Sequence, residues 1–300
     1  AQRYGFNFIE PSLLGRDVAF GLNLDYAETS SSYNSFDTER IVFQPTLSFP
    51  VSENGRLSLN YTYDDLEMSE RDDTTTGFVV ANDIAAGRQV TSSIGYNYSY
   101  DTRRAGLDPT SGVLLQFGQD FAGLGGDTKF VKTTAKAIGE KRIFNEEVTL
   151  RATLQGGALA WSEGNNRVSD RFLIGPSIMR GFETGGIGPR DQSNGSDDSL
   201  GGNLFVVGSL EAEFPLGLPE EYGISGGVFY DVGNVWNLDD VEIPTGSSIV
   251  GESGSFRHVI GVSLFWDTPV GPLQFNVSKA LKKEDFDEEQ KFEVTLRTDF

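Results

Sequence analysis

The residue with the clearest chemical demand is Arg180, which lies between Met179 and Gly181 in the stretch 171–191, RFLIGPSIMRGFETGGIGPRD. Apolar side chains are spread through this stretch, and a freely solvated loop would leave them exposed. We expect the stretch to fold back against the rest of the chain and to carry the guanidinium inward. A buried arginine needs carboxylate partners, because an unpaired buried ion costs several kcal/mol. The predicted chemistry is ion pairing that holds a loop in place.

Groups suited to catalysis are sparse. His258 is the only histidine, and it shares one face of an expected strand with Ile260 and Val262, which predicts a rim or lipid-facing position and no role as a base. The many serines lack a partnered base, which nucleophilic hydrolysis requires. We therefore predict no catalytic residue and no enzyme activity.

Acidic residues gather in short clusters at 72–73, 197–198, 239–240 and 284–289. We interpret them as solvated loop faces; the alternative is that divalent cations bridge them to lipopolysaccharide. None has the ligand spacing of a calcium loop, and the chain has no cysteine for a thiolate site. We therefore predict no metal and no cofactor. The net charge of -20 argues against nucleic acid as a partner, since little would neutralise phosphates.

Alternation of apolar and polar residues dominates the chain, as in residues 57–64 (LSLNYTYD) and 93–100 (SIGYNYSY). This period of two is typical of strands with one buried or lipid-covered face. No apolar run approaches the roughly 18 residues of a spanning helix, and no segment has helical periodicity. About thirteen strands are expected, each near the roughly 9–11 residues that cross a bilayer: 3–10, 17–28, 39–50, 56–66, 90–101, 113–122, 129–140, 147–160, 203–214, 222–236, 256–266, 272–280 and 291–300.

The connections between these strands alternate in length. Tight turns are expected at 11–16, 51–55, 107–112, 143–146, 215–221 and 267–271, and mostly longer polar connections at 29–38, 67–89, 161–202, 237–255 and 281–290, with 123–128 as a short exception. A β-sandwich also alternates its faces, but it has no reason to segregate loop length by side. Short turns on one side and long loops on the other are typical of an outer-membrane barrel. The fold class predicted is an all-β, antiparallel transmembrane barrel over residues 1–300.

The end of the chain supports the membrane interpretation. Phe292, Val294, Leu296 and Phe300 share one face of the last strand, while charged and polar residues occupy the other. This pattern resembles the recognition signal of barrels that are assembled into bacterial outer membranes. Bacterial barrels have even strand numbers with both ends on one side, so thirteen strands predict a fragment that lacks an odd number of strands at its front. The alternative is a short extra strand at 77–81.

Several motifs together resemble the barrel of the BamA-type outer-membrane insertases, also called the bacterial surface antigen family. The resemblance covers essentially the whole chain. Its most specific element is the MRGF sequence of Met179, Arg180, Gly181 and Phe182, similar to the family's Val-Arg-Gly-Phe/Tyr loop motif. The supporting stretches are GPRD at 188–191, GGN at 201–203, SLE at 209–211, FYDVGNVW at 229–236, PVGPL at 269–273 and DPTSG at 108–112.

The resemblance implies a barrel of sixteen strands, three of them absent here, with POTRA modules upstream. It also implies that the loop at 161–202 folds into the lumen, where Arg180 meets Glu211, Phe229 and Asp231. The alternation along the two strands places these three residues on the lumen face, in agreement with that expectation. A guanidinium can fork onto carboxylate and stack on a ring, which lysine cannot imitate.

The function implied is the folding and insertion of client barrels into the Gram-negative outer membrane without ATP, through a seam between first and last strands. The partners implied are outer-membrane lipid and lipopolysaccharide, unfolded outer-membrane protein clients and accessory assembly lipoproteins. Two alternatives stay open. One is a related translocator, TamA-like or of the two-partner secretion type; the other is a passive pore or structural surface antigen.

Overall fold

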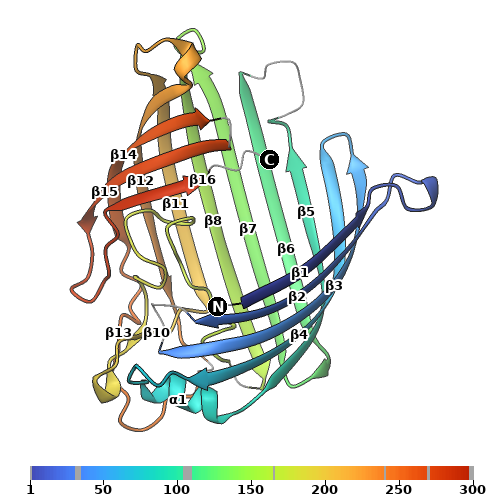
Figure 1. Ribbon diagram of the computed structural model, residues 1–300, viewed down its shortest axis with the longest axis vertical. Helices are drawn as coiled ribbons and strands as arrows, with labels where there is room; N and C mark the ends of the chain where they lie inside the picture. Colours follow the sequence, from blue (N-terminus) through green and yellow to red (C-terminus); the bar gives the residue numbers. More distant parts are fainter. Residues whose placement is uncertain are drawn as a thin grey trace.

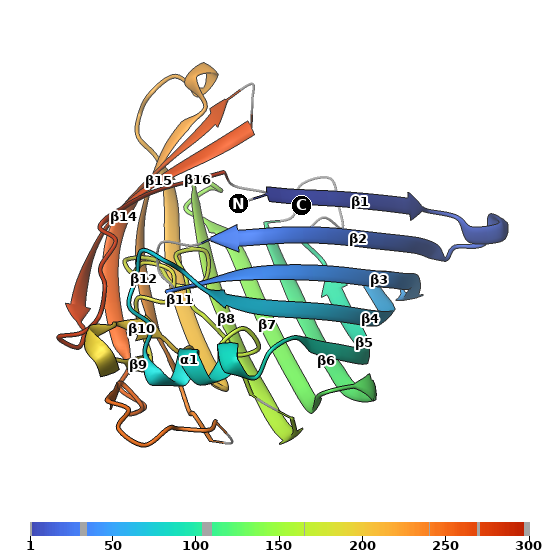
Figure 2. The same cartoon turned by 60° about the horizontal axis from the view of Figure 1, so that its bottom comes forward.

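The chain forms one antiparallel sheet of 13 strands that follow one another in chain order. The computed structural model describes residues 2–30, 35–103, 110–164, 166–239, 241–268 and 271–296. Figure 1 shows the sheet as a tall curved wall, and Figure 2 shows it curling around the segment between β8 and β11. The strands are β1 (Gln2–Glu10), β2 (Ala19–Ser30), β3 (Phe36–Ser52), β4 (Gly55–Glu70), β5 (Gln89–Asp101), β6 (Ser111–Gly126), β7 (Lys129–Ile143), β8 (Val148–Glu163), β11 (Leu204–Pro215), β12 (Ile224–Trp236), β14 (Arg257–Thr268), β15 (Gly271–Lys282) and β16 (Phe292–Leu296).

All thirteen strands expected from the alternation are present, which confirms the all-β antiparallel prediction. Several run further than predicted. For example, β4 continues to Glu70, where it still pairs with β3. Beyond Tyr63 the apolar residues move from odd to even positions, at Leu66 and Met68, and these two side chains are buried rather than exposed.

The two faces of the sheet differ in polarity. Leu154, Leu210 and Val277 point outward, and their exposures of 58%, 60% and 52% are high for large apolar residues. Glu211, adjacent to Leu210, points to the inner face, where it pairs with an arginine. An apolar outer face on a strand-built wall is the pattern of a transmembrane barrel, in which lipid covers that face.

The connections alternate as expected. One end of the sheet carries the turns 11–18, 53–54, 144–147 and 216–223, while the other end carries the connections 71–88, 164–203, 237–256 and 283–291. The connection 164–203, here called the inner loop, contains β9 (Arg190–Asp191) and β10 (Asp198–Ser199). Both belong to a three-stranded sheet completed by β13 (Ile249–Val250). The alternation predicted none of these two-residue strands, because each is too short to show a period.

A helix, α1 (Phe78–Ala85), lies in the connection 71–88, so the predictions of no helix and of a possible strand at 77–81 are both wrong. The first amide groups of α1 are satisfied from the inner loop. The N–H of Gly77 donates to Asp198 at 2.7 Å and that of Val79 to Asp191 at 3.0 Å. A helix of this length depends on tertiary contacts, and these acceptors lie more than 100 positions away, so no local signal announces it. No helix among the described residues is long and apolar enough to span a membrane.

The long connections form a second core beyond the end of the sheet. Its buried members come from β3, β4, α1, the inner loop and the connection 237–256: Phe36, Leu66, Met68, Val79, Val80, Val168, Leu200 and Leu238. The long loops are thus packed together rather than spread in solvent, and α1 joins the sheet to the inner loop.

Two acidic groups lie beside this core. The carboxylate of Asp83 in α1 accepts the N–H of Val168 at 2.9 Å, and burial raises its pKa. Burial also raises the pKa of Asp170 to about 6, although the N–H of Arg167 and the charges of Lys132 and Arg171 oppose this shift. The ionised form of Asp170 is therefore a local cost at neutral pH.

Replacing Asp191 should loosen α1. The Asp191→Ala variant leaves the N–H groups of Val79 and Ser193 without their acceptor, and an unsatisfied buried donor costs about 1–3 kcal/mol. We expect faster hydrogen exchange of residues 77–86, measured by mass spectrometry. The matched control is Asp72→Ala, which removes an exposed acid from the connection 71–88 that contains α1. Unchanged exchange in the Asp191 variant would show that the inner loop does not hold the helix.

The stability of the Asp170 region should depend on pH. The folded pKa of about 6 lies above the unfolded value of roughly 3.9. The folded state therefore binds the proton more tightly, and stability rises as pH falls through 6. Asp170→Asn should raise the free energy of unfolding in urea by up to about 3 kcal/mol at pH 7.5 and by about 1 kcal/mol at pH 4.5, with the gain gone by about pH 3. A gain of equal size at both pH values would contradict the assignment.

Candidate functional site

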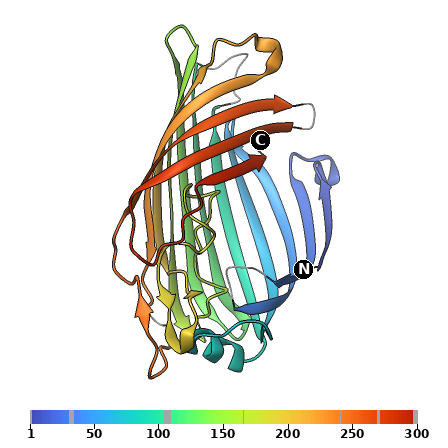
Figure 3. The same cartoon turned by 60° about the vertical axis from the view of Figure 1, so that its left-hand side comes forward.

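The inner loop packs against the inner face of the sheet, as Figure 3 shows from the side. Its side chains Ile174, Met179, Phe182 and Ile187 are at most 1% exposed. They share one apolar cluster with residues of β11, β12 and β14, namely Val207, Phe229, Val235 and Val259. Apolar burial of this extent docks the loop as part of a core.

Arg180 lies within this docked loop and reaches two carboxylates. Its Nε and Nη2 donate to the two carboxylate oxygens of Asp231 at 2.8 and 2.7 Å, a forked pair. Its Nη1 donates to Glu211, and its Nη2 also donates to the hydroxyl of Ser209 at 2.7 Å. The sheet register sets this geometry, because Ser209 pairs with Asp231 and Glu211 pairs with Phe229 across β11 and β12.

The aromatic ring of Phe229 forms another side of the arginine site. The guanidinium carbon of Arg180 lies 3.6 Å from the centre of the Phe229 ring, within the range of a cation–π contact. The ring in turn covers Gly261 on β14, where an added Cβ would lie 2.3 Å from the Phe229 Cζ atom. A side chain at 261 would displace the ring, so Gly261 is part of the site.

Gly181 lets the chain turn at this point. Its φ of +91° is strained for other residues, and an added Cβ would lie 2.8 Å from Val259. The backbone therefore approaches β14 closely immediately after the arginine. Met179 and Phe182, on either side, are buried in the apolar cluster. Within the MRGF motif, Met179 and Phe182 are therefore apolar anchors, Arg180 forms the ion pairs and Gly181 allows the turn.

The ion pairs continue beyond Arg180 along the inner face. The second oxygen of Glu211 accepts Arg151 at 2.9 Å, and the same guanidinium donates to Glu140 at 2.7 Å. These residues lie on β11, β8 and β7, so one row of alternating charges crosses three strands. The side chains of Glu211 and Asp231 are 8% and 1% exposed, and removal of a partner would leave a buried charge.

The motif is also hydrogen bonded to the segment that leads into β16. Phe182 forms a β-bridge with Glu289. The N–H of Gln290 donates to Gly181 at 3.0 Å, and the N–H of Glu183 donates to Glu288 at 3.0 Å. The inner loop therefore fixes the point where the last strand begins.

Two further buried arginines hold the same region. Arg190, 2% exposed, donates to Asp197 and Glu288 at 3.0 Å each. Arg257 forms a forked pair with Asp287, both bonds being 2.8 Å. Both arginines thereby bind the connection 283–291 to the rest of the molecule.

The structure brings together the residues expected around Arg180, namely Glu211, Phe229 and Asp231. Sequence reasoning missed Ser209, Arg151, Glu140 and Gly261, as well as the pair of Arg257 and Asp287. The strand alternation could have placed the first three on the inner face, but nothing in the sequence selects them from the other inward polar residues. Asp287 lies in an acidic cluster that we interpreted as solvated, and burial at 7% exposure shows that this is wrong for Asp287.

The residues of the last strand lie apart from the arginine site. Phe292, Val294 and Leu296 are exposed on the outer face of β16, and Phe300 lies outside the described residues. The imidazole of His258 forms a hydrogen bond with the hydroxyl of Tyr230 at 2.5 Å. No group of three or more metal-binding side chains occurs among the described residues. The arrangement around Arg180 offers charge neutralisation and a fixed loop rather than a reacting group.

Comparison with known proteins assigns this fold to a family. A family model described as the Omp85 superfamily domain matches residues 1–300. The outer membrane protein assembly factor BamA of Neorickettsia risticii (strain Illinois) is 29% identical over 280 residues, which cover 93% of this chain and 36% of that protein. The sorting and assembly machinery component 50 homolog A of Xenopus laevis is 29% identical over 251 residues, or 80% of this chain and 51% of that protein.

Solved structures share the fold. The crystal structure of BamA from Haemophilus ducreyi lacking POTRA domains 1-3 aligns with a TM-score of 0.80 at 21% identity, covering 97% of this chain and 61% of that one. CdiB from Acinetobacter baumannii aligns with a TM-score of 0.57 at 12% identity, covering 97% of this chain and 48% of that one. The chain thus spans about a third to a half of the two curated relatives. The match over residues 1–300 shows that the chain belongs to the Omp85 superfamily, and its fold is that of a BamA-type barrel.

Proposed function

We propose that this chain is the membrane barrel of an outer-membrane insertase, which folds client β-barrel proteins and inserts them into a bacterial outer membrane. The similarity to a BamA assembly factor over 93% of the chain supports this proposal. The clients would be unfolded outer-membrane proteins, and the surroundings outer-membrane lipid and lipopolysaccharide. Accessory lipoproteins would assist, and no ATP would be consumed.

The observation that carries the proposal is the link from Arg180 to the last strand. Arg180 binds the inner loop to β11 and β12, and main-chain hydrogen bonds bind that loop to residues 288–290, directly before β16. One end of β16 is therefore held firmly. Along its described residues β16 pairs with β15 from Phe292 to Leu296. In this proposal the loop holds the start of β16 in place, while the edge of β16 that does not face β15 pairs with a client strand.

A seam between first and last strands is the expected place of insertion. Within the described residues β16 pairs with β15, and in the proposed seam its other edge would offer main-chain donors and acceptors to an incoming strand. Phe292, Val294 and Leu296 would face lipid beside that edge and act with Phe300 as the assembly signal.

The packed inner loop argues against the passive pore. A pore needs an open lumen, whereas here Met179 and Phe182 fill the space beside β12 and β14 with buried apolar contacts. A passive pore would also not require the forked ion pair of Arg180 with Asp231, which fixes a loop inside the lumen. The related translocators would share this loop, and client insertion distinguishes them from an insertase.

The test is insertion by the full-length protein in liposomes, measured as the rate at which an urea-unfolded client barrel becomes protease-resistant. Arg180→Ala should lower the rate at least tenfold, because it leaves the buried carboxylate of Asp231 without its cation, at a cost of about 3–5 kcal/mol, while Glu211 keeps only its pair with Arg151. Arg180→Lys should restore little, since lysine cannot fork onto Asp231 while lying over Phe229. Added ATP should change nothing.

The matched control is Arg16→Ala, which removes an exposed arginine from the turn 11–18. It should insert clients at the rate of the unmodified protein. If Arg180→Ala also inserts at that rate, the loop does not serve insertion. If the unmodified protein conducts ions freely and accelerates no client, the passive pore is the correct function.

A further inference from the structure

A β-bulge at the long-loop end of β15 changes the face to which its last side chain belongs. His258 of β14 pairs with Lys282 and Val259 pairs with Ala280, so Leu281 is an extra residue between the two pairs. In a regular strand, residues 280 and 282 would share one face, and Ala280 packs against the apolar cluster on the inner face. The bulge therefore moves Lys282 to the outer face.

Three side chains that can bind an anion share this part of the outer face: His258, Lys279 and Lys282. Lys279 pairs with Ile260, which is 47% exposed on the outer face. His258 lies two residues before Ile260 and therefore on the same face, and Lys282 pairs with it. The two lysines are thus two register positions apart, roughly 7 Å along the strands. Both ammonium groups can reach one ligand.

Neither of these lysines has an acidic partner. Among the residues that the structure describes, no carboxylate lies within ion-pair distance of Lys279 or Lys282. Glu289 is taken by two other lysines, with Lys283 at 3.1 Å and Lys291 at 3.7 Å. The two ammonium groups are therefore available to a ligand.

The other acids of the connection 283–291 do not fill this role. Asp287 and Glu288 are held by the two buried arginines described above. Glu284 accepts the hydroxyl of Ser255 at 2.6 Å. Asp285 forms no ion pair with either lysine within the described part of the chain. The lysines thus remain unpaired although the connection is acidic.

A lysine at the same end of another strand shows the usual alternative. Lys129, the first residue of β7, is paired with Glu163 at the end of β8. That pair neutralises itself at the rim of the sheet. The outer face of β14 and β15 lacks such an acid and needs an external anion instead.

The position of the lysines matches the headgroups of a lipid leaflet. Lys282 is the last residue of β15, and Lys279 lies three residues before it. Toward the middle of the strands the same face is apolar, with Val262 55% exposed and Val277 52% exposed. A lysine is costly at the centre of a lipid-facing wall and tolerated near its rim. The surface thus presents two unpaired ammonium groups beside an apolar wall.

We propose that this surface binds a lipid that carries a phosphate monoester, in the leaflet beside the long loops. The phosphate lies between Lys279 and Lys282, and an acyl chain lies along Val262 and Val277. A phosphate monoester carries a charge of about -1.5 to -2 near neutral pH, which two ammonium groups neutralise. A phosphate diester carries a single negative charge and matches the pair less well.

His258 supplies a further donor to the same phosphate. Its Nδ1 is hydrogen bonded to the hydroxyl of Tyr230 at 2.5 Å. When that hydroxyl donates to Nδ1, the proton of the ring lies on Nε2, which can donate to the lipid. The bond to Tyr230 also holds the ring in one orientation on the outer face.

This lipid site depends on the lipid-facing outer face of the sheet and not on the proposed insertion activity. Lipid binding can be measured without a client, and insertion can be measured without this lipid. Failure of one proposal therefore leaves the other standing.

The test is native mass spectrometry of the full-length protein in detergent with added phosphatidic acid, the Kd being taken from the fraction of lipid-bound protein. Lys279→Gln combined with Lys282→Gln should raise the Kd about tenfold or more, because both charge-assisted hydrogen bonds are lost. Lys279→Arg combined with Lys282→Arg should keep the Kd within about threefold, since the charges remain. Phosphatidylglycerol, a diester, should bind more weakly than phosphatidic acid.

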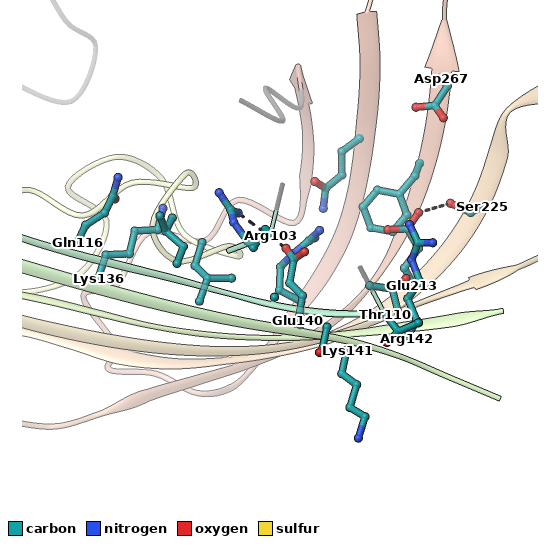
Figure 4. Close-up of a pocket in the computed structure, with 18 of the residues that line it drawn as sticks. Arg103, Thr110, Gln116, Lys136, Glu140, Lys141, Arg142, Glu213, Ser225 and Asp267 are labelled. Carbon is teal, nitrogen blue, oxygen red and sulfur yellow. Dashed lines mark hydrogen bonds and ion pairs between the residues drawn. The ribbon is translucent and has the colours of Figure 1, made fainter. Parts of the chain in front are cut away.

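The matched control is Lys141→Gln, an exposed lysine at the short-turn end of β7. Lys141 pairs with Leu150, which is 41% exposed on the outer face. Figure 4 shows Lys141 directed away from the cavity on the inner face, into which Lys136 projects. The control removes the same charge from the same outer face at the other end of the sheet, and it should change the Kd less than about twofold.

Four results would overturn the proposal. An unchanged Kd in the double glutamine variant would show that the two lysines hold no lipid. An equal loss of affinity in the Lys141 variant would reduce the effect to general surface charge. Equal affinity for phosphatidylglycerol would remove the preference for a monoester. Displacement of phosphatidic acid by inorganic phosphate at comparable concentration would make the surface a site for free phosphate.

Discussion

The forked ion pair of Arg180 with Asp231 is the interaction on which the inner side of this molecule depends. The loop that carries the arginine connects strands of the sheet, and the carboxylates that receive it lie on β11 and β12. Removal of the guanidinium would leave the buried carboxylate of Asp231 without its cation, while Glu211 would keep Arg151. The arginine therefore converts an inward acidic patch, which would otherwise oppose folding, into the anchor of the inner loop.

That anchor has consequences in two directions. Toward the long loops, the same segment supplies Asp191 and Asp198, which satisfy the first amides of α1 and so bring a second core together. Toward the end of the chain, it holds residues 288–290 through main-chain hydrogen bonds and Glu288 through Arg190, while Arg257 of β14 holds Asp287. One loop thus determines where the helix and the last strand begin.

The strands of the sheet could be predicted from the sequence better than the helix and the ion pairs of the loops. Alternation located all thirteen strands, because each has one face toward lipid and one toward the interior. It missed α1, whose first amides are bound by distant residues, and it misread Asp287, a loop residue whose buried partner Arg257 lies on β14. The MRGF motif identified the arginine and its three main partners by resemblance. Contacts such as Arg151 with Glu140 depend on the register between strands, which a single sequence does not specify.

If Arg180 keeps the inner loop docked, loss of the arginine should expose Met179 to solvent. The chain has no cysteine, so Met179→Cys introduces a single thiol at a position that is 0% exposed. Labelling by a maleimide should be slow when Arg180 is present and at least tenfold faster when Arg180→Ala is added. Equally slow labelling in both proteins would show that apolar packing alone docks the loop and that Arg180 is not its anchor.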